Sequence, residues 1–75
     1  MRFQKGDYVA HIDAFDGDMV DESHIIQITF INSYSFRFRS VSSNYRGPTN
    51  PIELLNLYEK VDYYKESPLY KVLNG

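Results

Sequence analysis

Five carboxylates crowd one short segment of this 75-residue chain, and a histidine stands on either side of them. The carboxylates are Asp13, Asp16, Asp18, Asp21 and Glu22, and the histidines are His11 and His24. Carboxylate oxygens bind hard cations such as Ca²⁺, and imidazole nitrogens bind Zn²⁺. The spacing fits neither site, because D-x-D-x-D-G and H-E-x-x-H are absent and Phe15 occupies a position that would need an oxygen. We predict a solvated acidic loop and no metal site.

The other polar residues form no catalytic pattern. Serines gather between residues 32 and 43, but no G-x-S-x-G elbow surrounds them and no glycine-rich phosphate loop occurs. The chain has no cysteine, which excludes disulfides, thiol catalysis and cysteine-ligated zinc. We therefore expect a non-enzymatic protein without catalytic residues, cofactor or metal.

A second chemical feature is the arginine pair of the stretch SFRFRS, Arg37 and Arg39, two positions apart. Because side chains of a strand alternate between its faces, phenylalanines in the core place both arginines on the outer face. Exposed strand charges commonly serve solubility and edge protection. The other interpretation is a binding face, since Tyr and Arg are enriched at interface hot spots. The residues that we expect to form this face are Tyr34, Arg37, Arg39, Tyr45 and Arg46.

Charge is divided unevenly along the chain, whose formal net charge is −2. Residues 12–24 hold the five carboxylates and no Lys or Arg, hence −5, whereas residues 25–51 hold three arginines and no acid, hence +3. Such asymmetry steers charged partners, but a pI near 5.5 lacks the broad basic footprint of nucleic-acid binders. We expect a protein partner. The alternative is nucleic acid, with the arginines on phosphates and Tyr34 or Tyr45 stacked on a base.

Short strands are expected to position these side chains. Alternating or β-branched stretches predict strands at residues 8–12, 25–31 and 36–41. Residues 13–23 are predicted as a loop from their Asp and Gly content, and residues 32–35 as a hairpin turn. Residues 42–50 then form a connection rich in Ser, Asn, Gly and Pro.

The C-terminal third begins with a helix signal, Asn50-Pro51-Ile52-Glu53, in which Asn50 is the expected N-cap. Periodicity does not separate a helix that continues through Val61 from a short helix followed by a strand at residues 58–64, and we prefer the second. Pro68 interrupts what precedes it, so residues 65–75 are predicted as a packed turn or a loose tail.

A chain of this length is one domain that buries only about 60% of its unfolded surface. Its core must therefore be small and rich in aromatic residues. The core residues that the alternation predicts are Tyr8, Val9, Ile12, Ile26, Ile28, Phe30, Phe36, Phe38, Leu54, Leu55 and Val61.

The KGDYV turn and strand, the long first loop, the central hairpin and the Pro-initiated helical turn before a last strand resemble the SH3-like small barrels, in particular the KOW and Tudor-like branch. The resemblance covers residues 4–64 of a single domain spanning 1–75. It implies a mainly β, partly open barrel of about five short strands, with a short helix near residues 51–57.

Two fragments, Ala14-Phe15-Asp16 and Ser43-Asn44-Tyr45, also resemble the peptide-binding SH3 domain. The groove of that family uses a tryptophan to hold proline-rich ligands, and this chain has none. Proline-rich peptides are therefore not expected as ligands.

Small, acidic, cysteine-free barrels of this kind resemble the accessory proteins with which bacteriophages and mobile elements redirect host machinery. The resemblance implies a regulator or inhibitor that docks on a host protein. The start MRFQKGDYV is unlike a signal peptide, and the longest apolar run is far shorter than the roughly 20 residues that cross a bilayer. We expect a cytoplasmic protein that does not contact the membrane.

Overall fold

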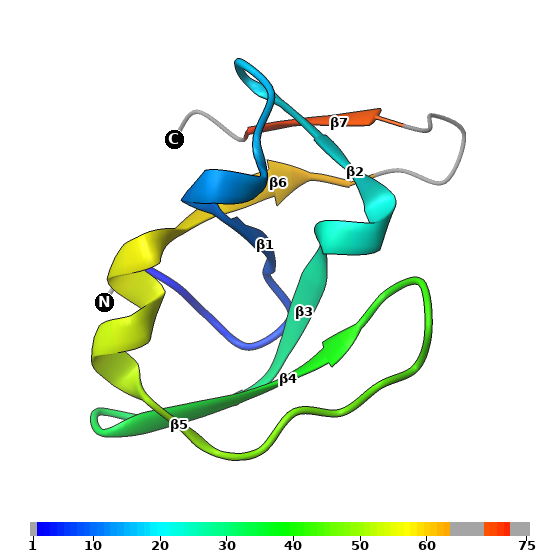
Figure 1. The fold of residues 1–75 in the computed structure, drawn as a ribbon. Coiled ribbons are helices and arrows are strands. Elements are labelled where there is room, and N and C mark those ends of the chain that lie inside the picture. Colours follow the sequence, from blue (N-terminus) through cyan, green and yellow to red (C-terminus); the bar gives the residue numbers. More distant parts are fainter. Residues whose placement is uncertain (1, 64–68, 73–75) are drawn as a thin grey trace.

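The computed structural model describes residues 2–63 and 69–72, and this part of the chain is built from short antiparallel strands (Figure 1). The strands are β1 (Tyr8–His11), β2 (Met19–Asp21), β3 (Ile26–Ile31), β4 (Ser35–Ser40), β5 (Asn50–Pro51), β6 (Tyr58–Asp62) and β7 (Leu69–Val72). In the same described residues, three 3₁₀ helices follow β1, β2 and β5: η1 (Ile12–Ala14), η2 (Glu22–His24) and η3 (Ile52–Leu57). The described strands follow the order β2-β7-β6-β1-β3-β4-β5, in which β2 and β5 are the edge strands. The mainly β, partly open architecture is confirmed, and its membership of the SH3-like barrels stays a prediction.

Strand β1 has buried side chains on both faces, which divides the core in two. Val9 packs in a first cluster, and its neighbour Ala10 packs in a second. The buried members of the first cluster are Phe3, Val9, Ile28, Phe36 and Leu55, and those of the second are Ala10, Val20, Ile25 and Val61. The sequence prediction of one core found five of these nine residues and missed Phe3, Ala10, Val20 and Ile25.

The β3–β4 hairpin carries an irregularity that moves Phe30 to the outer face. Ile28 pairs with Phe38, but after a β-bulge Phe30 pairs with Arg37 and Ile31 pairs with Phe36. One extra residue in β3 reverses the alternation beyond it, so that Ile31 packs on the core. Phe30 is 44% exposed, and its prediction as a core residue is wrong.

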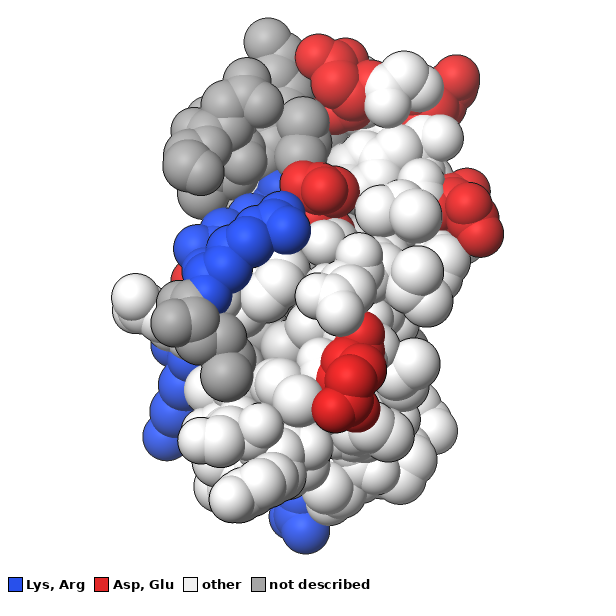
Figure 2. Space-filling model, turned by 90° about the vertical axis from the view of Figure 1, so that its left-hand side faces the viewer, with Lys and Arg blue, Asp and Glu red and all other residues white. Residues whose placement is uncertain are grey.

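Two other predicted core residues, Ile12 and Leu54, are also exposed. Ile12 leaves strand β1 and begins η1, so the alternation of the strand no longer applies to it. In η3 only Leu55 is buried, because one side of this short 3₁₀ helix contacts the core. Figure 2 shows the side of the molecule where η3 lies, and much of that surface carries no charged side chain. Tyr8, Ile26 and Phe38 are partly buried against the two clusters.

The predicted acidic loop at residues 13–23 contains regular secondary structure. It contains β2, whose Val20 is buried, and most of η1 and η2. A tight turn leads into β2, with backbone hydrogen bonds in both directions between Asp16 and Met19 and with Gly17 at φ 67°. The loop prediction is therefore wrong for residues 19–21. This stretch of three residues is too short to show the alternation that predicts a strand.

In the C-terminal third, the prediction of a short helix followed by a strand is confirmed, and the strand is β6. The helix is of the 3₁₀ type and begins at Ile52, after Pro51, which makes no side-chain cap. Asn50 lies in β5 and its side-chain amide donates to the Pro48 carbonyl oxygen over 2.9 Å, so its prediction as N-cap is wrong. Residues 69–72 form β7 rather than a turn or tail. The predictions for residues 64–68 and 73–75 lie outside the described residues.

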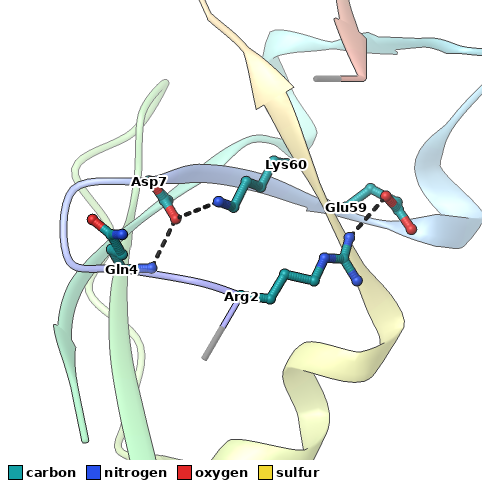
Figure 3. A network of polar contacts seen from close by, with 5 residues as sticks. All are labelled: Arg2, Gln4, Asp7, Glu59 and Lys60. Carbon is teal, nitrogen blue, oxygen red and sulfur yellow. Dashed lines mark hydrogen bonds and ion pairs between the residues drawn. The ribbon is translucent and has the colours of Figure 1, made fainter. Parts of the chain in front are cut away.

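Polar contacts tie the N-terminal segment to β6 (Figure 3). The Arg2 guanidinium lies 3.0 Å from a Glu59 carboxylate oxygen. The Asp7 carboxylate accepts a hydrogen bond from the backbone N–H of Gln4 over 2.8 Å and lies 3.5 Å from the Lys60 ammonium. The exposed Arg2–Glu59 pair contributes at most about 1 kcal/mol, and the buried Phe3 ring, which packs in the first cluster, adds apolar burial to the attachment of this segment.

Candidate binding face

Side chains on the outer face of β4 stand in two rows that run across β3, β4 and the connection after β4. In the first row, Arg39 is paired with Gln27 on one side and with Arg46 on the other. In the second row, Phe30 pairs with Arg37, and Arg37 Nε donates to Thr49 Oγ1 over 2.9 Å. We call these side chains the basic face: Gln27, Phe30, Arg37, Arg39, Arg46 and Thr49.

Arg39 and Arg46 occupy the closest kind of cross-strand pair. Two backbone hydrogen bonds flank them: Ser40 N–H to the Tyr45 carbonyl oxygen (2.7 Å) and Gly47 N–H to the Phe38 carbonyl oxygen (3.1 Å). Arg39 and Arg46 exchange no bonds with each other in this pattern, which places their Cα atoms about 4.5 Å apart with the side chains close together. Arg39 is also anchored from the other side, because its Nη2 donates to Gln27 Oε1 over 2.7 Å.

The connection that carries Arg46 is held against β4 by a close approach. A Cβ atom at Gly47 would overlap the Phe38 ring, so only glycine fits there without a shift. Upstream, Asn44 has φ 58°, the left-handed conformation that Asn tolerates better than most residues. These two positions set the path of the chain that brings Arg46 beside Arg39.

A hollow of about 430 Å³ opens at one end of the basic face. Its lining combines one aromatic ring, one cation and three small polar side chains: Phe30, Asn32, Ser35, Arg37 and Thr49. The Asn32 carboxamide oxygen is already used by the turn, because it accepts from the N–H groups of Tyr34 and Ser35 at 2.8 Å each. The free polar groups at the hollow are therefore mainly hydrogen-bond donors.

The three arginines of the face are not neutralised within the described part of the chain. The ion pairs found there join Arg2 to Glu59 and Lys60 to Asp7. Arg37 and Arg39 bind only neutral oxygens, and Arg46 has no hydrogen-bond or ion-pair partner among the residues described. The face therefore presents three positive charges to solvent or to a ligand.

Of the five residues predicted for the binding face, the structure brings the three arginines together. Tyr34 lies at the hairpin turn and is 83% exposed. Tyr45 is 59% exposed, but its ring lies 6.4 Å from the ring of Phe38, on the side of β4 away from the arginines. Sequence reasoning missed Gln27, Phe30 and Thr49, and for Phe30 the reason is the bulge, which has no signature in the sequence.

Much of the acidic segment lies away from the basic face, and its last part, η2, leads directly into β3. In Figure 1, the turn into β2 is at the top, whereas β4 and β5 are at the bottom. His11 Nδ1 accepts from the Asp13 N–H over 3.1 Å, and the His11 ring makes an edge contact with Tyr58. Among the residues that the structure describes, no three His, Asp or Glu side chains come together as a metal site would require.

No family model, curated protein or solved structure matches this chain. The helices in residues 2–63 and 69–72 are too short to cross a membrane. The side chains of the basic face are therefore the main guide to what the protein binds.

Proposed function

We propose that the protein is a small non-enzymatic binding module that docks on another protein through the basic face. The observation that carries the proposal is the group of three arginines without an acidic partner among the described residues, next to an exposed Phe30. Guanidinium groups that have no acidic partner can form ion pairs with an acidic surface. From the resemblance to phage accessory proteins, we further propose a cytoplasmic regulator or inhibitor whose partner is a host protein.

The side-chain chemistry favours a protein partner. Each guanidinium offers several donors in a planar fork that matches a carboxylate, and arginine is enriched at interface hot spots. Phe30, 44% exposed beside Arg37, adds apolar area that a partner would remove from water. The combination of an apolar anchor and oriented cations is typical of a compact interface core.

Nucleic acid is the second candidate, and one observation favours it. The Tyr34 ring is 83% exposed at the end of the hairpin, where a base could stack on it while arginines contact phosphates. Against this, residues 12–24 carry five carboxylates, which repel a polyanion that extends beyond the face. The charge balance therefore ranks this candidate below a protein partner.

The test is a pull-down from a bacterial lysate with tagged protein, with and without nuclease. The informative variant is Arg37→Ser with Arg46→Ser, because both side chains are exposed. Arg2→Ser with Lys5→Ser removes the same charge elsewhere and serves as the matched control. We expect the partner to be lost from the first variant in nuclease-treated lysate and retained by the control. Capture that survives both double replacements would reject the basic face as the interface.

A further inference from the structure

We infer, on the basis of this proposed function, that the basic face binds an extended acidic peptide segment. The segment has carboxylates at alternate positions and an apolar side chain two residues before or after them. The carboxylates pair with the arginines, and the apolar side chain enters the hollow beside Phe30. Three observations each support one part of this assignment: the spacing of the three arginines, the Arg39–Arg46 pair with no acidic group between its members among the described residues, and the position of the hollow.

The spacing of the cations matches an extended chain. Arg37 and Arg39 lie two positions apart on β4, which separates their Cα atoms by about 6.6–6.8 Å along the strand. In an extended peptide lying along β4, side chains at positions i and i+2 have the same separation and face the same way. Carboxylates at adjacent positions would point to opposite sides, so that only one of them could reach the face.

The Arg39–Arg46 pair forms a clamp for one of these carboxylates. Like charges directly opposite each other destabilise a sheet, and here no acidic group from the described residues lies between them. A carboxylate placed across the pair receives two charge-assisted hydrogen-bonding partners and removes the repulsion. Gln27 holds the Arg39 guanidinium in place from the opposite side, which reduces the entropy lost on binding.

The hollow places the apolar side chain at the Arg37 end of the face. Its wall is formed by Phe30, and Ser35 and Thr49 are at its rim. Its volume of about 430 Å³ is ample for a Phe or Leu side chain. The segment therefore contains an apolar residue, then an acidic residue over Arg37, then an acidic residue over the Arg39–Arg46 pair, each two positions from the last.

A peptide fits this face better than a nucleic acid. Five extended residues span about 17 Å, so the segment ends before it leaves the face. A longer polyanion would continue toward the carboxylates of residues 12–24. The charge distribution therefore favours a short acidic segment of a protein.

The experiment measures fluorescence anisotropy of labelled peptides with the full chain. The probe is Phe-Ser-Glu-Ser-Glu between glycines, together with its reversed order, because the direction of binding is part of the test. The matched control has the same composition with adjacent acids, Phe-Glu-Glu-Ser-Ser. A third peptide carries Gln in place of Glu, and a twelve-nucleotide oligothymidylate represents nucleic acid.

We expect one order of the alternating peptide to bind about tenfold or more tightly than the adjacent-acid isomer, since one carboxylate contact is lost in the isomer. Arg37→Ser with Arg46→Ser should abolish this preference, and Arg2→Ser with Lys5→Ser should retain it. Equal binding of both isomers would overturn the alternate spacing, as would no binding of any peptide. Tighter binding of the oligonucleotide would overturn the peptide class. If any of these contrary results occurs while arginine-dependent capture from the lysate persists, the peptide inference fails and the proposed function stands.

Discussion

Arg39 and Arg46 stand directly opposite each other on two antiparallel segments, in a pair flanked but not joined by backbone hydrogen bonds. Such a pair brings two guanidinium groups close together at a cost in stability. The cost is accepted on a face where the described residues provide three arginines and no acidic partner. Stability and binding therefore make opposite demands on Arg46.

The first prediction is that Arg46→Ser stabilises the protein at low salt. Removing one of two opposed like charges should raise the free energy of unfolding by about 0.2–1 kcal/mol. The gain should fade in 1 M salt, where the screening length is about 3 Å. Urea denaturation at low and high salt measures both effects. Lys5→Ser, an exposed position with the same change of charge, should show no such gain, and an Arg46→Ser protein less stable than the parent at low salt would contradict the prediction.

The second prediction compares Phe30, which the bulge moves to the outer face, with Phe36 on the partner strand. Phe36 is fully buried, so Phe36→Ala should cost about 3–5 kcal/mol, enough to unfold a domain of this size. Phe30→Ala removes a ring that is 44% exposed and should cost clearly less. Thermal melting compares the two variants directly. Equal losses would mean that Phe30 is in the core and that β3 has no bulge.

The third prediction concerns the contact that positions Arg46. Gly47→Ala places a methyl group into the Phe38 ring and should cost about 1–3 kcal/mol, the usual range for an overpacked site. Because the clash involves one ring, Phe38→Leu should reduce the added cost of Gly47→Ala. A double-mutant cycle on unfolding free energies measures this coupling. Additive effects of the two replacements would show that the ring is not what excludes a side chain at Gly47.

The sequence was sufficient to predict the hairpin and the face on which its arginines lie, because the alternation of Phe36 and Phe38 with Arg37 and Arg39 is unbroken. It was not sufficient to predict the face on which Phe30 lies, because the bulge adds one residue to β3 and leaves no mark in the amino-acid pattern.

Three of the four buried residues of the second cluster also escaped prediction, for physical reasons. Val20 lies on the three-residue β2, which is too short to show a period, and Ala10 and Ile25 lie on the face of their predicted strands opposite to the one assigned to a single core. Within the described residues, the strand partner of β2 is β7, which is distant from it in the sequence. Pairings of this kind depend on the tertiary fold rather than on local pattern.

The last prediction is an alkaline loss of stability that depends on Tyr58. Burial raises the pKa of the Tyr58 hydroxyl above its ordinary value of 10.0. Below pH 10 both the folded and the unfolded protein keep this proton, so Tyr58 adds no pH dependence. As pH rises from 10 through the folded pKa, the unfolded chain releases the proton first, and stability falls because the folded state binds more protons. Tyr58→Phe should remove this part of the loss.

Urea midpoints at pH 8, 9, 10 and 11 test the sign of this effect. The stability of the parent should fall more steeply above pH 10 than that of Tyr58→Phe, whereas the difference between them should be constant from pH 8 to 9. Tyr34→Phe is the control, because that ring is 83% exposed and its replacement should leave the slope of the parent unchanged. Parallel curves for the parent and Tyr58→Phe across the whole range would show that the Tyr58 hydroxyl is as well solvated in the folded protein as in the unfolded chain.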